Sequence, residues 1–258
     1  MRKRDRAVTV LLLGLLVGLL LSACQSTSTV VKPQSDRAKL AEINTELGAQ
    51  YMQNRDYQIA MDKLTKAVEL EPRSVNAHST LALLHAAIGQ HDQAETSFKQ
   101  ALRIDGANSS VMNNYGQFLC QRGRHEEGET MILKAVANPL YANAENGYYN
   151  VGVCAMQSGK LEQADGYFRK ALEINGQMAP ALLQMADVSL QLQRAPQARA
   201  YLQRYSAMAQ LNARALWLGV RIERALGDRD AEASYALQLE KNFPDSSQTK
   251  LLLESNSQ

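Results

Sequence analysis

The sequence has few Trp and Phe residues and no long alternation of β-branched residues. Of its 258 residues, one is Trp and four are Phe. A sheet protein would show segments in which apolar β-branched residues alternate with polar ones. The chain instead has much Ala, Leu and Gln, which are good helix formers. The composition therefore predicts helices.

Motifs for catalysis and for cofactor binding are lacking as well. There is no His-Glu-x-x-His motif, no phosphate-binding loop and no Gly-x-Ser-x-Gly motif. Two of the four histidines, His78 and His85, fall at packing positions of one predicted helix, while His91 and His125 follow glycines at predicted helix starts. The carboxylates are scattered along predicted helix surfaces. We therefore expect no enzyme activity, cofactor, metal or small-molecule substrate.

One apolar run stands out, and it lies at the N-terminus. Residues 7–21 form a run of 15 residues rich in Leu and Val, preceded by the basic residues Arg2, Lys3, Arg4 and Arg6. A membrane-spanning helix needs about 20 apolar residues, whereas the hydrophobic region of a signal peptide has about 7–15. We expect residues 1–23 to be a cleaved signal peptide; the alternative is an uncleaved N-terminal anchor.

The residues at the end of that run, Leu21-Ser22-Ala23-Cys24, resemble the bacterial lipobox. The resemblance implies transfer of a diacylglyceryl group to the Cys24 thiol, cleavage before Cys24 and acylation of the new N-terminus. Several acyl chains form a stable membrane anchor. The next residue is Gln25 and not Asp, which in enterobacterial-type sorting implies the outer membrane. The folded part is then expected to face the periplasm.

Cleavage would leave a chain of almost balanced charge. The full chain has 28 basic and 26 acidic side chains, and residues 1–23 hold four of the former and one of the latter. The mature chain then has a net charge of about −1 and no clustered basic face. This excludes a footprint for nucleic acid or for anionic lipid.

Three segments share a spacing that marks an internal repeat. Gly89-Gln-His-Asp-Gln-Ala94, Gly123-Arg-His-Glu-Glu-Gly128 and Gly159-Lys-Leu-Glu-Gln-Ala164 are each followed, at a fixed distance, by an apolar residue and then Ala. This pattern resembles the tetratricopeptide repeat, whose period is 34 residues. The resemblance implies an all-α, right-handed superhelical solenoid of helix-turn-helix units. Six repeats span residues 40–245, with starts at Ala41, Val75, Ser109, Glu145, Ala179 and Ala213.

Two segments fall outside the repeats. Residues 24–39, rich in Ser, Thr and Gln, are expected to form a flexible tether. Residues 246–258 are expected to form either a short capping helix or a frayed coil.

Two cysteines, Cys120 and Cys154, lie 34 residues apart in the first helices of repeats three and four. These helices pack side by side in a repeat stack. In an oxidising compartment such as the periplasm, paired cysteines tend to form disulfides. We favour a disulfide, and the alternative is two buried thiols.

The central region carries a more specific resemblance. Asn114-Tyr-Gly-Gln-Phe-Leu-Cys120, Asn138-Pro-Leu-Tyr141 and Asn150-Val-Gly-Val-Cys154 resemble the type IV pilus biogenesis and stability lipoproteins, the PilF or PilW family. Members of this family are pilotins, which help the outer-membrane secretin ring to reach the membrane and oligomerise. The implied partner is the secretin subunit. Two alternatives are a repeat lipoprotein of the β-barrel assembly machinery and an adaptor for peptidoglycan enzymes.

The repeat fold also implies which residues line its concave groove. Two of them, Thr45 and Ala49, replace the Lys and Asn of the clamp that binds charged C-terminal tails, so such tails are poor ligands. Met and Leu side chains suit apolar groups, and Asn amides suit a peptide backbone. We expect an extended or amphipathic secretin segment here, with its apolar anchor in repeats one and two; the alternative is that these residues only pack or face water. The candidates are Met52, Asn76, Leu83, Asn113, Asn114, Tyr149, Asn150, Met156 and Trp217.

Overall fold

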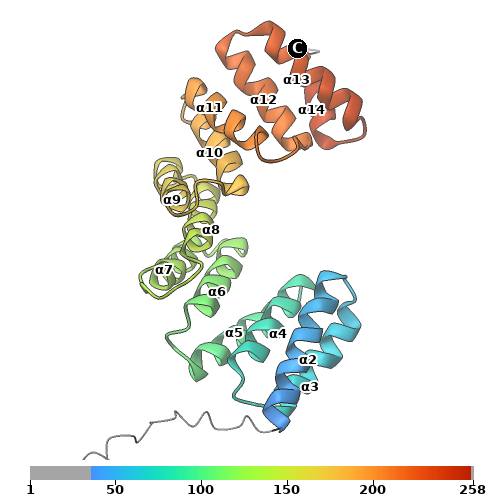
Figure 1. The fold of residues 1–258 in the computed structure, drawn as a ribbon, viewed down its shortest axis with the longest axis vertical. Helices are drawn as coiled ribbons and strands as arrows, with labels where there is room; N and C mark the ends of the chain where they lie inside the picture. The colour runs from blue at the N-terminus through green and yellow to red at the C-terminus, as the bar shows by residue number, and fades with distance from the viewer. Residues whose placement is uncertain (1–35, 257–258) are drawn as a thin grey trace, which may run out of the picture. The chain divides into compact units, whose positions relative to one another are not determined.

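The computed structural model describes residues 36–256, which form one all-α unit (Figure 1). Within that range there are thirteen helices and no strand, which confirms the predicted fold class. The first helices of the six repeats are α2 (Asp36–Gln53), α4 (Val75–Ala87), α6 (Ser109–Gln121), α8 (Ala144–Gln157), α10 (Ala179–Gln191) and α12 (Ala213–Leu226). The second helices are α3 (Tyr57–Leu70), α5 (His91–Ile104), α7 (His125–Val136), α9 (Leu161–Ile174), α11 (Ala195–Ser206) and α13 (Arg229–Asn242), and α14 (Ser247–Asn256) follows the last repeat.

The helices stack in chain order. From α4 to α13, each first helix packs on the second helix of its own repeat and on the second helix of the repeat before it. First helices of neighbouring repeats, such as α6 and α8, also contact each other. One repeat cannot bury its own apolar face, so this nearest-neighbour packing completes the core.

The helix starts follow from capping residues in the sequence. Ser74, Asn108 and Asn212 precede α4, α6 and α12, and each side chain accepts a hydrogen bond from the backbone N–H three residues later. Such caps satisfy one of the donors that the first helical turn leaves unpaired. These three helices therefore begin at the residues where the repeat register starts.

The turn inside every repeat has one residue with positive φ. Glycine occupies it in four repeats, as Gly123 with φ 77° illustrates. In repeats one and five the same position is held by Arg55 (φ 65°) and Gln193 (φ 60°). A residue with a Cβ atom pays a steric cost in this conformation, so these two turns are strained.

The core is built from small residues that let helices approach. Ala60, Ala94, Ala164 and Ala198 hold the same position in four second helices and are fully buried. In repeat three that position is a glycine, Gly128. A Cβ atom placed on Gly116 of α6 would lie 2.7 Å from the carbonyl oxygen of Gly128, so the two backbones touch directly.

The ends of the repeat stack differ from the sequence-based boundaries. The assignment of residues 36–39 to the tether is wrong, because α2 begins at Asp36. The Asp36 carboxylate in the first turn is favourable to the helix dipole. Of the two options for the C-terminal tail, the structure shows a helix. In α14, Leu252 is 1% exposed and packs with Leu216, Val220 and Leu239.

The signal peptide, Cys24 and most of the predicted tether lie outside the described residues. Among the residues that are described, no helix is long and apolar enough to cross a membrane.

Candidate functional site

Three of the asparagines predicted to line the groove are brought together at the junction of α6 and α8. The Asn150 side-chain amide donates a hydrogen bond of 3.0 Å to the Asn113 carbonyl, and the Asn113 amide donates one of 3.3 Å to Asn114. Asn113 is 6% exposed, so it ties the two helices together. Asn114 and Asn150 are only half-buried, and each side-chain amide has bonding capacity left for a peptide backbone.

A cleft of about 100 Å³ lies along the same two helices. Gln117 and Gln121 line it from α6, and Asn150 and Gln157 line it from α8. The sequence reasoning missed Gln121 and Gln157. The signal was present, because Gln121 lies two helical turns after Asn113 and Gln157 lies two turns after Asn150, on the same helix faces.

The apolar candidates do not form one continuous surface. Met52 packs against a cluster that holds Leu64 and Leu84, whereas Leu83 packs against another cluster. Tyr149 and Met156 belong to a third, where the Tyr149 ring lies 5.9 Å from the Phe168 ring. The two remaining candidates are Asn76, which is exposed, and Trp217, which packs near the C-terminus.

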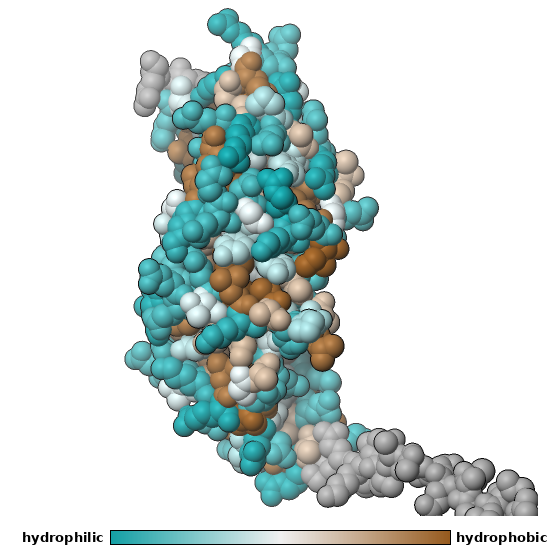
Figure 2. Space-filling view, turned by 90° about the vertical axis from the view of Figure 1, so that its left-hand side faces the viewer, coloured by the Kyte–Doolittle hydropathy of each residue, from teal (hydrophilic) through white to brown (hydrophobic). Residues whose placement is uncertain are grey.

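The first helix has an exposed apolar face that the sequence reasoning did not single out. In α2, Leu40, Ile43 and Leu47 are 46%, 43% and 36% exposed. Their spacing of three and four residues places them on one side of the helix. On the face of the molecule drawn in Figure 2, apolar patches lie among polar ones.

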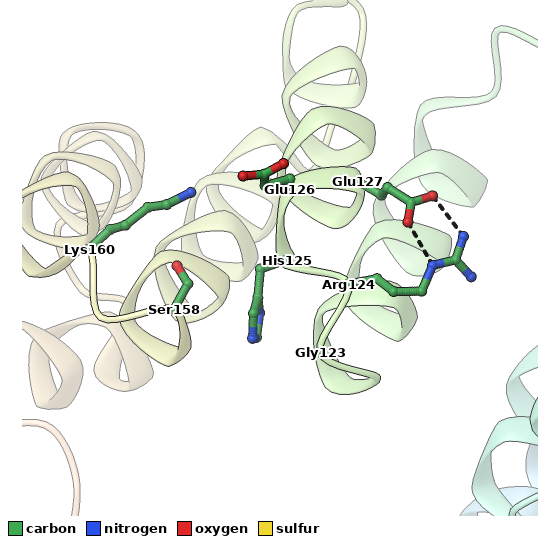
Figure 3. A pocket seen from close by; sticks show the side chains of 7 residues that line it. All are labelled: Gly123, Arg124, His125, Glu126, Glu127, Ser158 and Lys160. Atoms are coloured by element: carbon green, nitrogen blue, oxygen red, sulfur yellow. Dashed lines mark hydrogen bonds and ion pairs between the residues drawn. The ribbon is translucent and has the colours of Figure 1, made fainter.

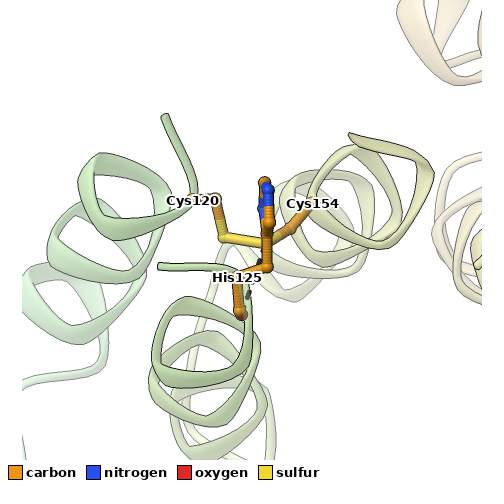
Figure 4. A group of neighbouring side chains, drawn as sticks. All are labelled: Cys120, His125 and Cys154. Carbon is orange, nitrogen blue, oxygen red and sulfur yellow. Dashed lines mark hydrogen bonds between the residues drawn. A yellow bond between two sulfur atoms is a disulfide. The ribbon is translucent and has the colours of Figure 1, made fainter. Parts of the chain in front are cut away.

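The two central cysteines lie at the same junction as the asparagine cluster. The structure joins Cys120 of α6 to Cys154 of α8 as a disulfide with Cα atoms 5.5 Å apart (Figure 4). Both residues are buried, and both line the cleft described above. Nδ1 of His125 lies 3.8 Å from the Cys154 sulfur.

A second cleft, of about 500 Å³, lies beside His125, among the turns of repeats three and four (Figure 3). Its cations are already paired. Arg124 donates to Glu127 at 2.7 Å, and Lys160 lies 3.1 Å from Glu129. This cleft therefore has no unpaired Arg or Lys that would attract an anionic substrate.

Ion pairs connect successive repeats at one repeated pair of positions. Glu95 pairs with Arg124 at 2.8 Å, and the equivalent residues Glu129 and Lys160 pair at the next junction. The pKa of Glu95 is lowered to about 2, first by its hydrogen bond with Lys99 and then by Arg124 and Tyr115. The lowered pKa thus reflects first an ion pair within α5 and then contacts with the next repeat.

Family models described as tetratricopeptide repeats match residues 45–109, 79–145 and 155–218. The type IV pilus assembly protein PilF of Pseudomonas aeruginosa is 33% identical over 241 residues, which cover 93% of this chain and 95% of that protein. A solved structure of PilF from that organism aligns with a TM-score of 0.76 and 32% identity, over 85% of this chain and 99% of the other. The crystal structure of PilW, described as a widely conserved type IV pilus biogenesis factor, aligns with a TM-score of 0.78 and 31% identity, over 83% and 98%. The chain therefore belongs to the PilF and PilW family of tetratricopeptide-repeat proteins of type IV pilus biogenesis.

Proposed function

We propose that this protein is a non-enzymatic, lipid-anchored pilotin: it binds the secretin subunit of the type IV pilus and promotes its localisation and multimerisation. The observation that carries the proposal is the match to a type IV pilus assembly protein along 93% of the chain. The site supports it, because a row of first helices whose amides keep bonding capacity beside apolar side chains suits a peptide.

The anchor and the repeats have separate roles in this proposal. Acyl chains on Cys24 hold the protein to the outer membrane, with the repeats in the periplasm. Residues 25–35 separate that anchor from Asp36, where α2 begins. Eleven fully extended residues span at most about 40 Å. The start of the first repeat is therefore held within that distance of the membrane, where a secretin subunit has to arrive.

The bound secretin segment is apolar at one end and extended at the other. Its apolar side chains contact repeats one and two at Met52 and Leu83. Its main chain pairs with Asn114 and Asn150 farther along the stack. Binding through main-chain hydrogen bonds gives affinity, and apolar pockets give specificity.

The first test asks which assembly needs the protein. Deletion of the gene should abolish pili and twitching motility, while outer-membrane barrel assembly and cell shape stay normal. A defect in bulk barrel assembly would instead support the role in the β-barrel machinery. A defect in cell shape would support the role as an adaptor for peptidoglycan enzymes.

The second test asks whether the groove binds the secretin. The double variant Met52→Glu, Leu83→Glu should lower the yield of secretin multimers, because it places charge where apolar groups have to dock. A matched control is Ile174→Glu, since Ile174 is 54% exposed at the end of α9, away from the groove. Circular dichroism and lipid labelling should be unchanged in both. Normal multimers in the double variant would reject this site and direct attention to repeats four to six.

A further inference from the structure

Three side chains that can bind a metal converge where repeats three and four meet. Cys120 lies near the end of α6, His125 begins α7, and Cys154 lies in α8. Their sulfur and nitrogen atoms all lie within 4.8 Å of one another, and Figure 4 shows the imidazole beside the two sulfurs. Each residue is held by a different helix, so the convergence is a product of repeat packing.

We propose that Cys120, His125 and Cys154 form a binding site for a thiophilic divalent cation, best suited to Zn²⁺, once their disulfide is reduced. Two external thiols, which join to form a disulfide, supply the two electrons that break the S–S bond and the two protons of the new thiols; with a phosphine, which becomes a phosphine oxide, the oxygen and the protons come from water. Binding of Zn²⁺ then releases both thiol protons, because only thiolates bind the metal. Water fills the fourth position, as in other sites with three protein ligands.

The distances suit tetrahedral zinc. With Zn–S bonds of about 2.3 Å and a Zn–N bond of about 2.0–2.1 Å, a ligand nitrogen and a ligand sulfur lie about 3.6 Å apart. Nδ1 of His125 is already 3.8 Å from the Cys154 sulfur. Two thiolates on one zinc ion lie about 3.8 Å apart. With Cα atoms 5.5 Å apart, the two side chains reach that separation by rotation about their Cα–Cβ bonds.

Charge and access also suit this metal. Cys120 is 5% exposed and Cys154 is fully buried, and a lone thiolate at such a site is costly. Two thiolates, a neutral imidazole and Zn²⁺ sum to zero charge, which removes that cost. The cluster lies between two clefts, one lined by the cysteines and the other by His125.

The preceding repeat contains a matched histidine without a metal site. His91 begins α5 as His125 begins α7, in the same position of its repeat. Its ring faces Phe118, with ring centroids 6.2 Å apart, and Phe118 offers no ligand atom. Two repeats therefore have a histidine at this position. Only His125 has cysteines beside it, so only His125 can act as a metal ligand.

Metal and disulfide are alternative links between α6 and α8. A reduced chain keeps the two helices joined through the metal. A small-molecule disulfide that accepts two electrons from the thiolates, and is itself cleaved to two thiolates, re-forms the Cys120–Cys154 bond and releases Zn²⁺. The link between repeats three and four thus persists under both reducing and oxidising conditions.

The test uses a full chain carrying Cys24→Ser, in which Cys120 and Cys154 are the only thiols. The protein is reduced with a phosphine and titrated with Co²⁺ as a spectroscopic probe and then with Zn²⁺. We expect one Co²⁺ per chain, with the sulfur charge-transfer and visible bands of a tetrahedral thiolate site, displaced by Zn²⁺. The oxidised chain should show no such bands. His125→Ala should weaken Zn²⁺ binding by more than about tenfold, while His91→Ala leaves it unchanged.

Several outcomes would overturn the proposal. One is the absence of thiolate bands in the reduced chain, and another is equal affinity in the His125→Ala and His91→Ala variants. Circular dichroism accompanies each titration, because unfolded thiols also bind metal. Bands that arise only after loss of helicity would count against a site built by the fold.

Discussion

Arg199 of α11 donates hydrogen bonds to the Glu223 carboxylate of α12. Arg199 also pairs with Asp228 at 3.1 Å. Arg199 and Asp228 hold the positions of the ion pairs between earlier repeats, with acid and base exchanged. At the three preceding junctions the equivalent position is acidic, and the partner in the next repeat is basic. The charges of repeat five at this junction therefore pair with those of repeat six and would oppose those of an earlier repeat.

Loss of Arg199 should destabilise the last two repeats. Glu223 is 3% exposed, and Arg199→Met leaves its carboxylate buried without a cation. We expect a loss of about 2 kcal/mol in the free energy of unfolding. Adding Glu223→Gln should recover more than half of it, because a neutral amide is cheaper to bury. Chemical denaturation measures both, and an equal loss in the single and double variants would contradict the pairing.

Acid should weaken the interactions of Glu95, both with Lys99 on its own helix and with Arg124 and Tyr115 across the junction of repeats two and three. The folded-state pKa of Glu95 is about 2, below its ordinary value of 4.5. Its stabilising effect is therefore complete above about pH 4.5 and is lost as the pH falls toward 2. Because solvent screens these interactions, we expect Glu95 to contribute about 1 kcal/mol to the free energy of unfolding. Unfolding measured at pH 7 and pH 3 should show a smaller difference for Glu95→Gln than for the parent. An unchanged difference would exclude Glu95 as the cause.

The link between Cys120 and Cys154 should be a disulfide in the purified, unreduced protein. It closes a loop with a sequence separation of 34, and such a link contributes about 2–4 kcal/mol. Thiol titration of the denatured, metal-free protein should find neither cysteine free, and Cys120→Ala should lower the stability by that amount. Two free thiols beyond any at Cys24 would refute the bond.

The strained turn of repeat five offers a route to higher stability. Gln193 is exposed and has φ 60°, so Gln193→Gly should raise the free energy of unfolding by about 1 kcal/mol. Gly159→Ala, in the same turn of repeat four, should lower it by a similar amount. If both substitutions shift the melting temperature in the same direction, the argument from φ fails.

The proposed anchor rests on Cys24, which lies outside the described residues. Cys24→Ala should block lipidation and leave precursor or mislocalised protein. Radioactive palmitate should label the parent protein alone. Label that persists in the Cys24→Ala protein would show that the lipid is attached elsewhere.

The sequence alone determined the repeat architecture. Gly123 and its equivalents mark a turn that needs positive φ, and Ser74 and Asn108 cap helices, so both signals act within a few residues. Side-by-side packing of equivalent helices follows from the period, which is why Cys120 and Cys154 were expected to meet. The start of α2 at Asp36 was not predicted, because its first helical turn precedes the residues that define the repeat.

Only the tertiary structure decided which side chains meet across repeats. The spacing gave His91 and His125 the same position, yet one faces Phe118 and the other Cys154. The sequence pattern did not predict that Leu40 and Ile43 of α2 are exposed, because an apolar stripe has the same sequence whether or not a neighbouring helix covers it. Burial and partner choice depend on three-dimensional neighbours, and the local sequence around a residue does not contain them.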